Sequence, residues 1–360
     1  MKTIGIICEY NPFHNGHAHQ LHTLTQLHPD ALRICIMSGS FVQRGEPAIF
    51  SKFDRARWAI LGGADIVIEL PTFYSTGSAQ LFGTGAIRMV KALAIDALSF
   101  GSETADLDAL VDIAKRMDCE STQEQLRTYI NEGISYGAAF RKALDTEILN
   151  TPNALLGLEY IRAGLAYNAK LEYIPILRTS NYHEETLTDE LPSGTALRQL
   201  ITSTGNLSSQ CITSTGTLAS QLQSTIPPSI AADMTQVIEN GNYVNYNRYH
   251  DIVHSLSRRT TPNELEKFGD FSEGIEHLWS KAAQQSSWTA ATEEIKSKRY
   301  TYARLQRMGA YLTLGITKDV LQNAMEEGPQ YARLLAFNNR SRQWLRNEYE
   351  IPLIQKWAKA

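Results

Sequence analysis

Residues 3–17 have the sequence TIGIICEYNPFHNGH, and this stretch decides the fold. Its first part, Thr3–Cys8, is a short apolar run enriched in isoleucine, which is typical of a buried strand. Asn11 and Pro12 are turn residues that end the extended run. Leucines at helical spacing over residues 21–27 predict a helix directly afterwards. The stretch therefore predicts a strand, a tight turn and the start of a helix.

The motif His14-Asn15-Gly16-His17 lies where the turn meets the predicted helix. Glycine at that point lets backbone N–H groups approach an anion closely. The unpaired N–H groups of a first helical turn and the helix dipole favour a phosphate there. Two imidazoles beside it can donate further hydrogen bonds. The motif therefore predicts phosphate handling, with ATP as the first candidate.

The histidines of this region also allow other interpretations. His14, His17, His19 and His22 could form a metal cluster, or they could be solvated on one face of a helix. The sequence has no HExxH pattern and no cysteine or carboxylate at the spacing of zinc proteases, which disfavours zinc. For His19 and His22 we prefer the surface interpretation.

The first half of the chain alternates predicted strands and helices. After Thr3–Cys8, strands are expected at 32–37, 65–70, 96–100 and 170–177, and helices at 52–61 and 79–94. Strands that are apolar throughout and separated by helices are typical of a parallel sheet covered on both faces. We therefore predict an α/β fold with a Rossmann-like parallel sheet. Ligands of such sheets bind beyond the carboxyl ends of the strands, where the loops 9–16, 38–47, 71–78 and 101–103 are expected.

The second half of the chain has a different composition. Residues 202–229 are rich in Ser, Thr, Gln and Gly and include two consecutive prolines, which predicts a linker or long loop. Amphipathic patterns beyond it predict a mainly helical C-terminal domain over residues 230–360. Residues 1–201 are then the expected catalytic domain.

Charge is unevenly distributed along the 360 residues, whose formal net charge is −4. From Lys296 to Arg346 ten Lys or Arg stand against three acids, a local +7, which leaves −11 for the rest. This asymmetry indicates a polyanion as the partner of the C-terminal region.

The four cysteines are scattered without a CxxC pair, no apolar run is long enough to span a bilayer, and no basic and apolar leader precedes the first strand. These features predict a cytoplasmic protein with reduced thiols and no membrane partner.

A second motif, Ser193-Gly194-Thr195-Ala196-Leu197-Arg198, follows the last strand expected in the first half and opens another helix. Ser193 can cap this helix, its first N–H groups and Thr195 can hold phosphate oxygens, and Arg198 adds a cation one turn later. Taken alone, the segment is more typical of an ordinary capped helix with a surface arginine. Together with the first motif, it predicts two helix starts that converge on one triphosphate.

The two motifs together resemble those of the nucleotidyltransferase superfamily, which binds ATP through an HxGH motif and a late SxTxxR motif. Further segments are similar to one family within it, the bacterial tRNA(Met) cytidine acetate ligases. The resemblance covers nearly the whole chain except residues 202–228. Its segments are MSGSFVQRGEP at 37–47, GADIVIELP at 63–71, FGSE at 100–103, KRYT at 298–301 with Arg304 and Arg307, and RLLAFN at 333–338.

This resemblance implies a two-step reaction. Acetate attacks the α-phosphate of ATP, which gives acetyl adenylate and pyrophosphate. The exocyclic amine of the wobble cytidine of elongator tRNA(Met) then attacks the acyl carbon, which gives N4-acetylcytidine and AMP. Neither step needs a protein nucleophile, because positioning and charge stabilisation suffice. Mg²⁺ is expected to accompany the triphosphate, but no carboxylate pair identifies its ligands.

The resemblance also implies roles for individual residues. His14 and His17 would stabilise charge on the α-phosphate and on the bridging oxygen, and Ser193, Thr195 and Arg198 would hold the β,γ end. The other expected ATP contacts are Ile7, Cys8, Glu9, Tyr10, Asn11, Pro12, Phe13, Asn15, Gly16, Gln20, Gly101, Asn153 and Arg178.

Three of these contacts have simpler alternatives. Gly101 could be a mere strand-end turn rather than a position that leaves room for ribose or adenine, and Asn153 could be a helix-start residue rather than a reader of the adenine edge. Arg178 could be a solvated charge rather than a phosphate or base contact.

Two further groups of residues are expected to meet acetate and RNA. Arg44 lies in a loop that we expect to close over acetate and the incoming cytidine, although the loop could equally be a structured surface. The basic segment around Tyr300 predicts an RNA-binding face, with a solvated helix face as the alternative. The expected RNA contacts are Lys296, Lys298, Arg299, Arg304 and Arg307.

Two other functions keep part of this pattern. A small-molecule nucleotidyltransferase that adenylylates a cofactor precursor would use the same ATP site, but it would not explain the basic C-terminal region. A non-catalytic RNA-binding protein regulated by a nucleotide would keep both the nucleotide site and the basic region. Acetate-dependent release of pyrophosphate would exclude this function. The sequence does not predict metal ligands or oligomeric state.

Overall fold

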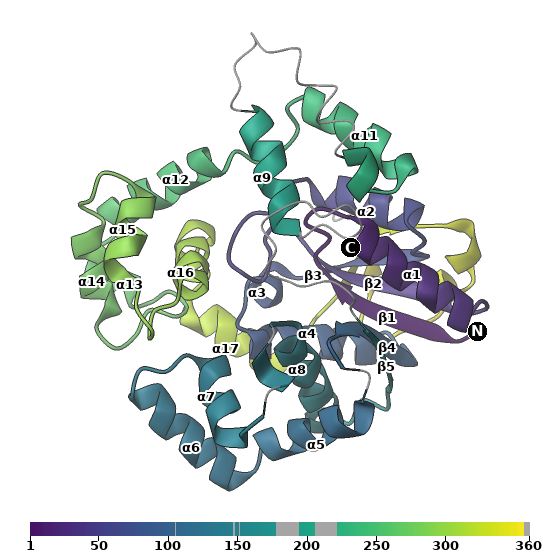
Figure 1. Ribbon diagram of the computed structural model, residues 1–360, viewed down its shortest axis with the longest axis horizontal. Helices are drawn as coiled ribbons and strands as arrows, with labels where there is room; N and C mark the ends of the chain where they lie inside the picture. Colours follow the sequence, from purple (N-terminus) through teal and green to yellow (C-terminus); the bar gives the residue numbers. More distant parts are fainter. Residues whose placement is uncertain (105, 147, 151, 178–193, 206–221, 356–360) are drawn as a thin grey trace.

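The computed structural model describes all residues except 105, 147, 151, 178–193, 206–221 and 356–360. Its centre is a seven-stranded sheet in the order β5-β4-β1-β2-β3-β6-β7 (Figure 1). The strands are β1 (Thr3–Cys8), β2 (Leu32–Ser38), β3 (Ile66–Leu70), β4 (Ala97–Ser102), β5 (Glu172–Leu177), β6 (Ala332–Phe337) and β7 (Leu353–Ile354). Strands β1 to β5 pair in parallel. The prediction of a Rossmann-like α/β fold is confirmed.

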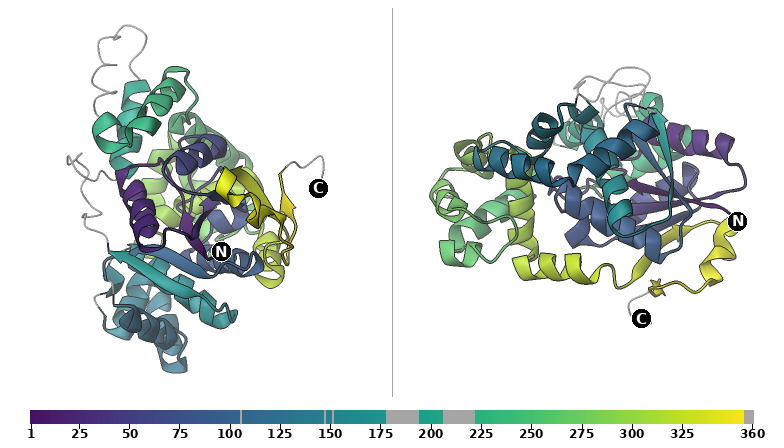
Figure 2. Two further views of the ribbon diagram at one scale, coloured as in Figure 1. Left: turned by 90° about the vertical axis from the view of Figure 1, so that its right-hand side faces the viewer. Right: turned by 90° about the horizontal axis from the view of Figure 1, so that it is seen from below.

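Helices cover both faces of this sheet and extend beyond it on one side (Figures 1 and 2). In chain order they are α1 (Asn15–Leu27), α2 (Lys52–Leu61), α3 (Thr72–Ser75), α4 (Ala79–Ala92), α5 (Leu107–Met117), α6 (Glu120–Asn131), α7 (Tyr136–Leu144), α8 (Pro152–Ala166), α9 (Gly194–Gly205), α11 (Pro228–Glu239), α12 (Tyr246–Arg259), α13 (Pro262–Leu265), α14 (Ile275–Ala282), α15 (Trp288–Ile295), α16 (Tyr302–Leu314) and α17 (Lys318–Glu327). In the described part of the chain, none of them is long and apolar enough to cross a membrane.

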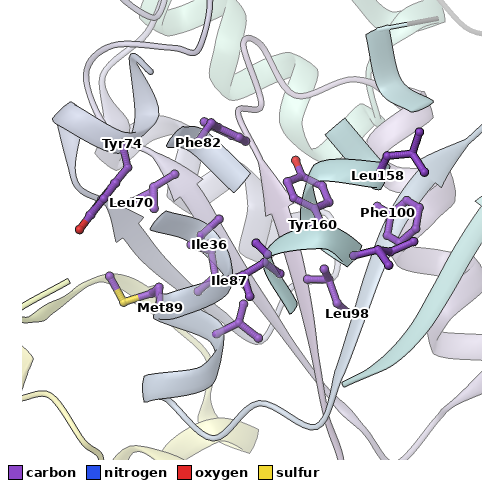
Figure 3. Close-up of a cluster of buried hydrophobic side chains, with 14 of the residues drawn as sticks. Ile36, Leu70, Tyr74, Phe82, Ile87, Met89, Leu98, Phe100, Leu158 and Tyr160 are labelled. Carbon is purple, nitrogen blue, oxygen red and sulfur yellow. The ribbon is translucent and has the colours of Figure 1, made fainter. Parts of the chain in front are cut away.

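The alternation of side chains along each strand explains why the central strands are apolar throughout. On β2, Ile34 and Ile36 face a core shared with α4, α5 and α8, and Figure 3 shows part of it. Cys35 and Met37 face the opposite core, which α1, α2, α9 and α11 cover. Because successive side chains point to opposite faces, a strand covered on both sides needs an apolar residue at every position.

The helices α12 to α16 form a group with its own core around Trp279 and Trp288. This group is attached to the sheet through the loops that follow β2 and β3. Tyr311 Oη in α16 donates to the backbone oxygen of Thr76 at 3.1 Å. Gly45 has a φ of +83°, and a Cβ there would lie 2.3 Å from the backbone nitrogen of Arg307. The helical group therefore lies directly against the carboxyl edge of the sheet.

The C-terminal region differs in part from the expected helical domain. Its last described α-helix is α17, after which β6 returns to the sheet antiparallel to β3, two short 3-10 helices follow at Asn339–Arg342 and Trp344–Arg346, and β7 pairs with β6. Within the expected linker at 202–229, α9 continues to Gly205 and α11 begins at Pro228, whereas residues 206–221 lie outside the described residues. The strand at 332–337 was not predicted because its pairing partner, Ile66–Glu69, is remote in sequence.

Asp65 attaches this returning strand to the sheet. Its buried carboxylate accepts hydrogen bonds from the backbone N–H of Arg33 at 2.9 Å and from Asn338 Nδ2 at 2.7 Å, and it forms an ion pair with Arg33 at 2.9 Å. Asp65 belongs to the GADIVIELP segment, so that part of the family resemblance has a structural explanation.

We expect Asp65→Ala to lower the free energy of unfolding by about 3–5 kcal/mol, because it leaves the Arg33 guanidinium buried without its counter-charge. Urea unfolding measures this loss. Asp30→Ala, which removes an exposed carboxylate from the turn before β2, is the matched control and should change stability little. Equal stability of the two variants would contradict the role assigned to Asp65.

Candidate active site

The turn between β1 and α1 fixes both histidines of the first motif by reciprocal backbone hydrogen bonds. His14 is the N-cap of α1, and its Nδ1 accepts from the backbone N–H of Gly16 at 3.1 Å. His17 Nδ1 accepts from the backbone N–H of His14 at 3.3 Å, and the two rings stack with centroids 3.8 Å apart. Because Nδ1 is the acceptor in each ring, the neutral imidazole carries its proton on Nε2. Each histidine thus presents Nε2 as a hydrogen-bond donor.

Two aromatic residues of the turn pack against this histidine pair. The ring of Tyr10 lies 4.7 Å and that of Phe13 lies 5.6 Å from the ring of His17, between centroids. Both side chains are buried, and the Tyr10 hydroxyl lies 3.4 Å from Cys35 Sγ. Burial raises the pKa of Tyr10 well above its usual value. Tyr10 and Phe13 therefore shape the turn through packing.

The start of α9 lies against the same turn. Arg198 Nη1 donates to the backbone oxygen of Asn11 at 2.7 Å, and Arg198 Nη2 donates to Thr195 Oγ1 at 3.1 Å. A Cβ on Gly194 would lie 3.3 Å from that Asn11 oxygen. The two helix starts, more than 170 residues apart in sequence, thus meet at Asn11. Their N–H groups, the Nε2 donors and a guanidinium can together hold one polyanion.

The loop after β2 closes the other side of this arrangement. Glu9 Oε1 accepts from the backbone N–H of Gln43 at 2.7 Å. Desolvation raises the pKa values of the half-buried Glu9 and Glu46 carboxyls, whereas the positive charges of Arg198 and Arg44 lower them. Arg44 itself is exposed at the carboxyl edge. The loop therefore brings the Arg44 cation and the Glu46 carboxyl group close to the turn between β1 and α1, which itself contributes Glu9.

The other expected ATP contacts lie on the neighbouring elements. Gln20 Nε2 donates to Ser99 Oγ at 3.3 Å, which links α1 to β4, and Asn15 Nδ2 donates to the backbone oxygen of Ser224 at 3.1 Å. Gly101 is in β4, opposite Ile176 of β5. Asn153 is in the first turn of α8. Ser193 and Arg178 lie outside the residues that the structure describes.

The basic residues expected to contact RNA fall into two groups. Lys296, Lys298 and Arg299 are exposed between α15 and α16. Arg304 and Arg307 point toward the loop before α14, where Arg304 Nη2 donates to the backbone oxygen of Asp270 at 3.1 Å and Arg307 Nε lies 3.3 Å from Asp270 Oδ2.

Acids from outside the basic segment partly offset its charge. Arg299 pairs with Glu273 at 2.6 Å and Lys296 lies 3.5 Å from Glu293. The count along the sequence therefore overstates the positive charge of this surface. Lys298 and its exposed neighbours remain the part that a large anion can reach.

The comparisons with known proteins agree with this geometry. The model of the family described as HIGH Nucleotidyl Transferase matches residues 1–360. The chain belongs to this family. Its His14-Asn15-Gly16-His17 has the family's histidine, glycine and histidine, with asparagine in second place.

Members of the family with curated names include close relatives of this chain. The tRNA(Met) cytidine acetate ligase of Lysinibacillus sphaericus is 33% identical over 100% of this chain and 90% of its own length. That of Acetivibrio thermocellus is 34% identical over 99% of this chain and 88% of its own length. This HIGH nucleotidyltransferase is thus a member of the tRNA(Met) cytidine acetate ligase group.

Solved structures show the same fold. Apo Thermotoga maritima TmcAL matches with a TM-score of 0.91 and 28% identity over 99% of this chain and 86% of its own. The same protein bound with alpha-thio ATP matches with a TM-score of 0.86 and 28% identity over 98% and 85% of the two chains.

One important residue of this HIGH nucleotidyltransferase was not found by sequence reasoning. Arg55 in α2 is fully buried, and its guanidinium donates to the backbone oxygens of Glu9 at 2.6 Å, Ser38 at 3.0 Å and Phe50 at 3.2 Å, and also to that of Gly39. It thus ties the ends of β1 and β2 together. Burial lowers the pKa of Arg55 to about 10. The available signal was an arginine between apolar positions of the predicted helix 52–61.

The residues described by the structure contain no group of three or more His, Cys, Asp or Glu side chains placed to hold a metal ion. The four histidines of the first motif region are accordingly not a preformed cluster. His14 and His17 stack on each other, whereas His22 is exposed and lies 2.9 Å from Gln26 through its Nε2.

Proposed function

We propose that this protein is an ATP-dependent ligase that activates acetate as acetyl adenylate and acetylates N4 of the wobble cytidine of elongator tRNA(Met). The observation that carries the proposal is the match of the whole chain to curated tRNA(Met) cytidine acetate ligases. The two helix starts that meet at Asn11 supply the anion site that such chemistry needs. tRNA as substrate makes the cytoplasm the expected compartment.

In the first step the protein holds ATP and stabilises charge. The Nε2 donors of His14 and His17 would contact the α-phosphate and the bridging oxygen, and the start of α9 with Thr195 and Arg198 would hold the β,γ end. An acetate oxygen forms a bond to the α-phosphorus, and the bond to the bridging oxygen breaks as pyrophosphate leaves. Hydrogen-bond donors that already face the developing negative charge lower the activation barrier of this step, because they need not reorganise during the reaction.

In the second step the cytidine amine attacks the acetyl carbon. The new N–C bond forms, the C–O bond to AMP breaks, and one amine proton is released. We assign Arg44 to the carboxylate of acetate and to the edge of the incoming cytidine, because it is exposed beside Glu9 and Glu46 at the carboxyl edge. No protein nucleophile takes part, so positioning is the main contribution of the protein.

We expect Mg²⁺ to accompany the triphosphate at this site. Magnesium keeps several waters and binds substrate phosphates together with few protein groups. The described residues offer no preformed cluster for it, and the triphosphate oxygens would supply its ligands. The metal would neutralise phosphate charge when bound.

We assign ATP chemistry to residues 1–201 and tRNA binding to the helices within residues 230–360. The helices α12 to α16 contact the loops after β2 and β3, at the edge where the reaction is proposed. A substrate held on these helices would therefore reach acetyl adenylate without a large movement.

Three parallel incubations test the proposed function. The protein is mixed with ATP, labelled acetate and total bacterial tRNA, and the same mixture is prepared without acetate or without tRNA. We expect label in N4-acetylcytidine and one AMP for each acetyl group. Pyrophosphate release should require acetate. An adenylylated small molecule as product, or pyrophosphate release that does not depend on acetate, would contradict the ligase assignment.

For the exposed basic group, we expect the double variant Lys296→Ala, Lys298→Ala to weaken tRNA binding and to make it less dependent on salt. Each lost phosphate contact lowers the slope of log affinity against log salt by about one. The measurement is a salt titration of tRNA affinity. Lys115→Ala on α5, an exposed lysine away from this group, is the control. Equal slopes for the double variant and the wild-type protein would remove these lysines from the RNA interface.

A further inference from the structure

An exposed aromatic ring lies at the carboxyl edge of the sheet, outside the histidine and Arg198 arrangement. Phe53 is the second residue of α2, and 53% of its surface is exposed. A single exposed apolar side chain is ordinary in itself. What distinguishes Phe53 is the set of charged groups around it.

Two cations from distant parts of the chain lie near this ring. Lys52 Nζ is 5.9 Å and Arg333 Cζ is 5.7 Å from the centroid of Phe53. Both are held by one carboxylate, since Glu69 Oε1 is 2.6 Å from Lys52 Nζ and Glu69 Oε2 is 3.2 Å from Arg333 Nη1. One carboxylate therefore orients two cations beside an exposed ring.

Other described groups lie near the ring and its cations. Asp54, the acid that follows Phe53, pairs with Arg57 at 3.0 Å on its own helix. Tyr331 lies close enough to Glu69 and Arg333 that both charges affect its pKa, which burial raises. A second aromatic residue therefore flanks the same ion group.

The position of this group follows from the strand register. Glu69 is opposite Arg333, at the carboxyl end of β3 and the start of antiparallel β6. Strand β3 is two positions from β1 in the sheet, and two strand spacings are about 10 Å. Phe53, whose neighbour Lys52 pairs with Glu69, and the histidine motif after β1 therefore lie along one edge of the sheet.

We propose that Phe53 is a stacking platform for an RNA base next to the cytidine that is acetylated, with Lys52 and Arg333 contacting the adjoining phosphates. Sequence-tolerant stacking on an exposed aromatic ring combined with cationic phosphate contacts is how proteins bind splayed, single-stranded RNA. Glu69 orients both cations before the RNA arrives. The inference rests on the proposed function, since it takes a tRNA anticodon loop as the ligand.

The test measures direct binding of a fluorescently labelled anticodon stem-loop to the full-length protein. We expect Phe53→Ala to weaken binding about tenfold, within the range measured for loss of one stacked base. Phe53→Trp should retain affinity, because it keeps an aromatic face. Phe337→Ala is the matched control: Phe337 is also exposed, but it lies beside Ile66 at the other end of β6.

A second arm removes the base instead of the ring. Stem-loops with an abasic nucleotide on the 5′ or the 3′ side of the wobble cytidine are titrated against the wild-type protein and Phe53→Ala. One of the two abasic stem-loops should bind the wild-type protein and Phe53→Ala with equal affinity, because it lacks the base that stacks on Phe53. Equal affinity of the wild-type protein and Phe53→Ala for the intact loop, or a tenfold difference that persists with both abasic loops, would overturn the proposal.

These outcomes separate the platform from the enzyme assignment. Stem-loop binding that depends on Phe53, without acetate-dependent pyrophosphate release, would support the platform and reject the ligase function. Normal acetylation with no effect of Phe53 on binding would support the ligase function and reject the platform. A wild-type protein that does not bind the stem-loop at all would overturn the platform.

Discussion

Replacing His17 by asparagine is expected to lower the rate of acetate-dependent adenylate formation by about 100-fold or more, with little change in stability. Asparagine can keep an acceptor for the backbone N–H of His14, the bond that His17 Nδ1 now accepts at 3.3 Å. It has no group in place of Nε2. Loss of one preorganised donor to a developing negative charge costs about 10²–10³ in rate. ATP–pyrophosphate exchange with acetate measures this step alone.

Two companion variants separate catalysis from helix capping. His17→Ala also removes the acceptor, so it should lose thermal stability in addition to activity. His22→Ala, an exposed histidine on the same helix, should behave as the wild-type protein does. Exchange activity of His17→Asn within a few-fold of the wild-type rate would show that the imidazole acts only as part of the helix cap.

Arg198→Ala is expected to raise the KM for ATP and to lower kcat/KM for adenylate formation by about 100-fold. The guanidinium bridges Asn11 and Thr195, so it both holds the two helix starts together and supplies charge for the phosphates. Truncating one partner of a charged hydrogen-bonded contact commonly costs 2–5 kcal/mol. Steady-state exchange kinetics over a range of ATP concentrations measure the two parameters.

Arg198→Lys tests whether geometry or charge matters at this position. A single ammonium cannot reproduce the planar fork that reaches two acceptors, so lysine should recover only a small part of the lost activity. Arg127→Ala on α6, an exposed arginine, should leave the exchange kinetics unchanged. Full recovery with lysine would mean that charge alone acts there.

Much of the sheet and its helices could be predicted because their signals are local. The strand at Thr3–Cys8 and the helix at Lys52–Leu61 have the predicted bounds, since each is marked by an apolar run or stripe between turn residues. The meeting of the two helix starts was also expected, because both follow strands of one parallel sheet. Their contacts with ATP remain predictions.

The parts that could not be predicted depend on contacts between remote segments. Strand β6 is held by Asp65 and by pairing with β3. Neither contact can be recognised from the sequence around residues 332–337. Arg55 is buried because the ends of two strands and one loop converge on it, whereas arginine in a helix is usually exposed. The acids that pair with Arg299 and Lys296 lie outside the segment whose charge was counted.

A crystal structure of this protein with ATP bound would test most directly whether both helix starts bind one triphosphate. We predict that, in the same complex, phosphate oxygens lie within hydrogen-bond reach of Nε2 of His14 or His17 and of the Arg198 guanidinium. A nucleotide whose phosphates contact only one of the two helix starts, or neither, would contradict the account.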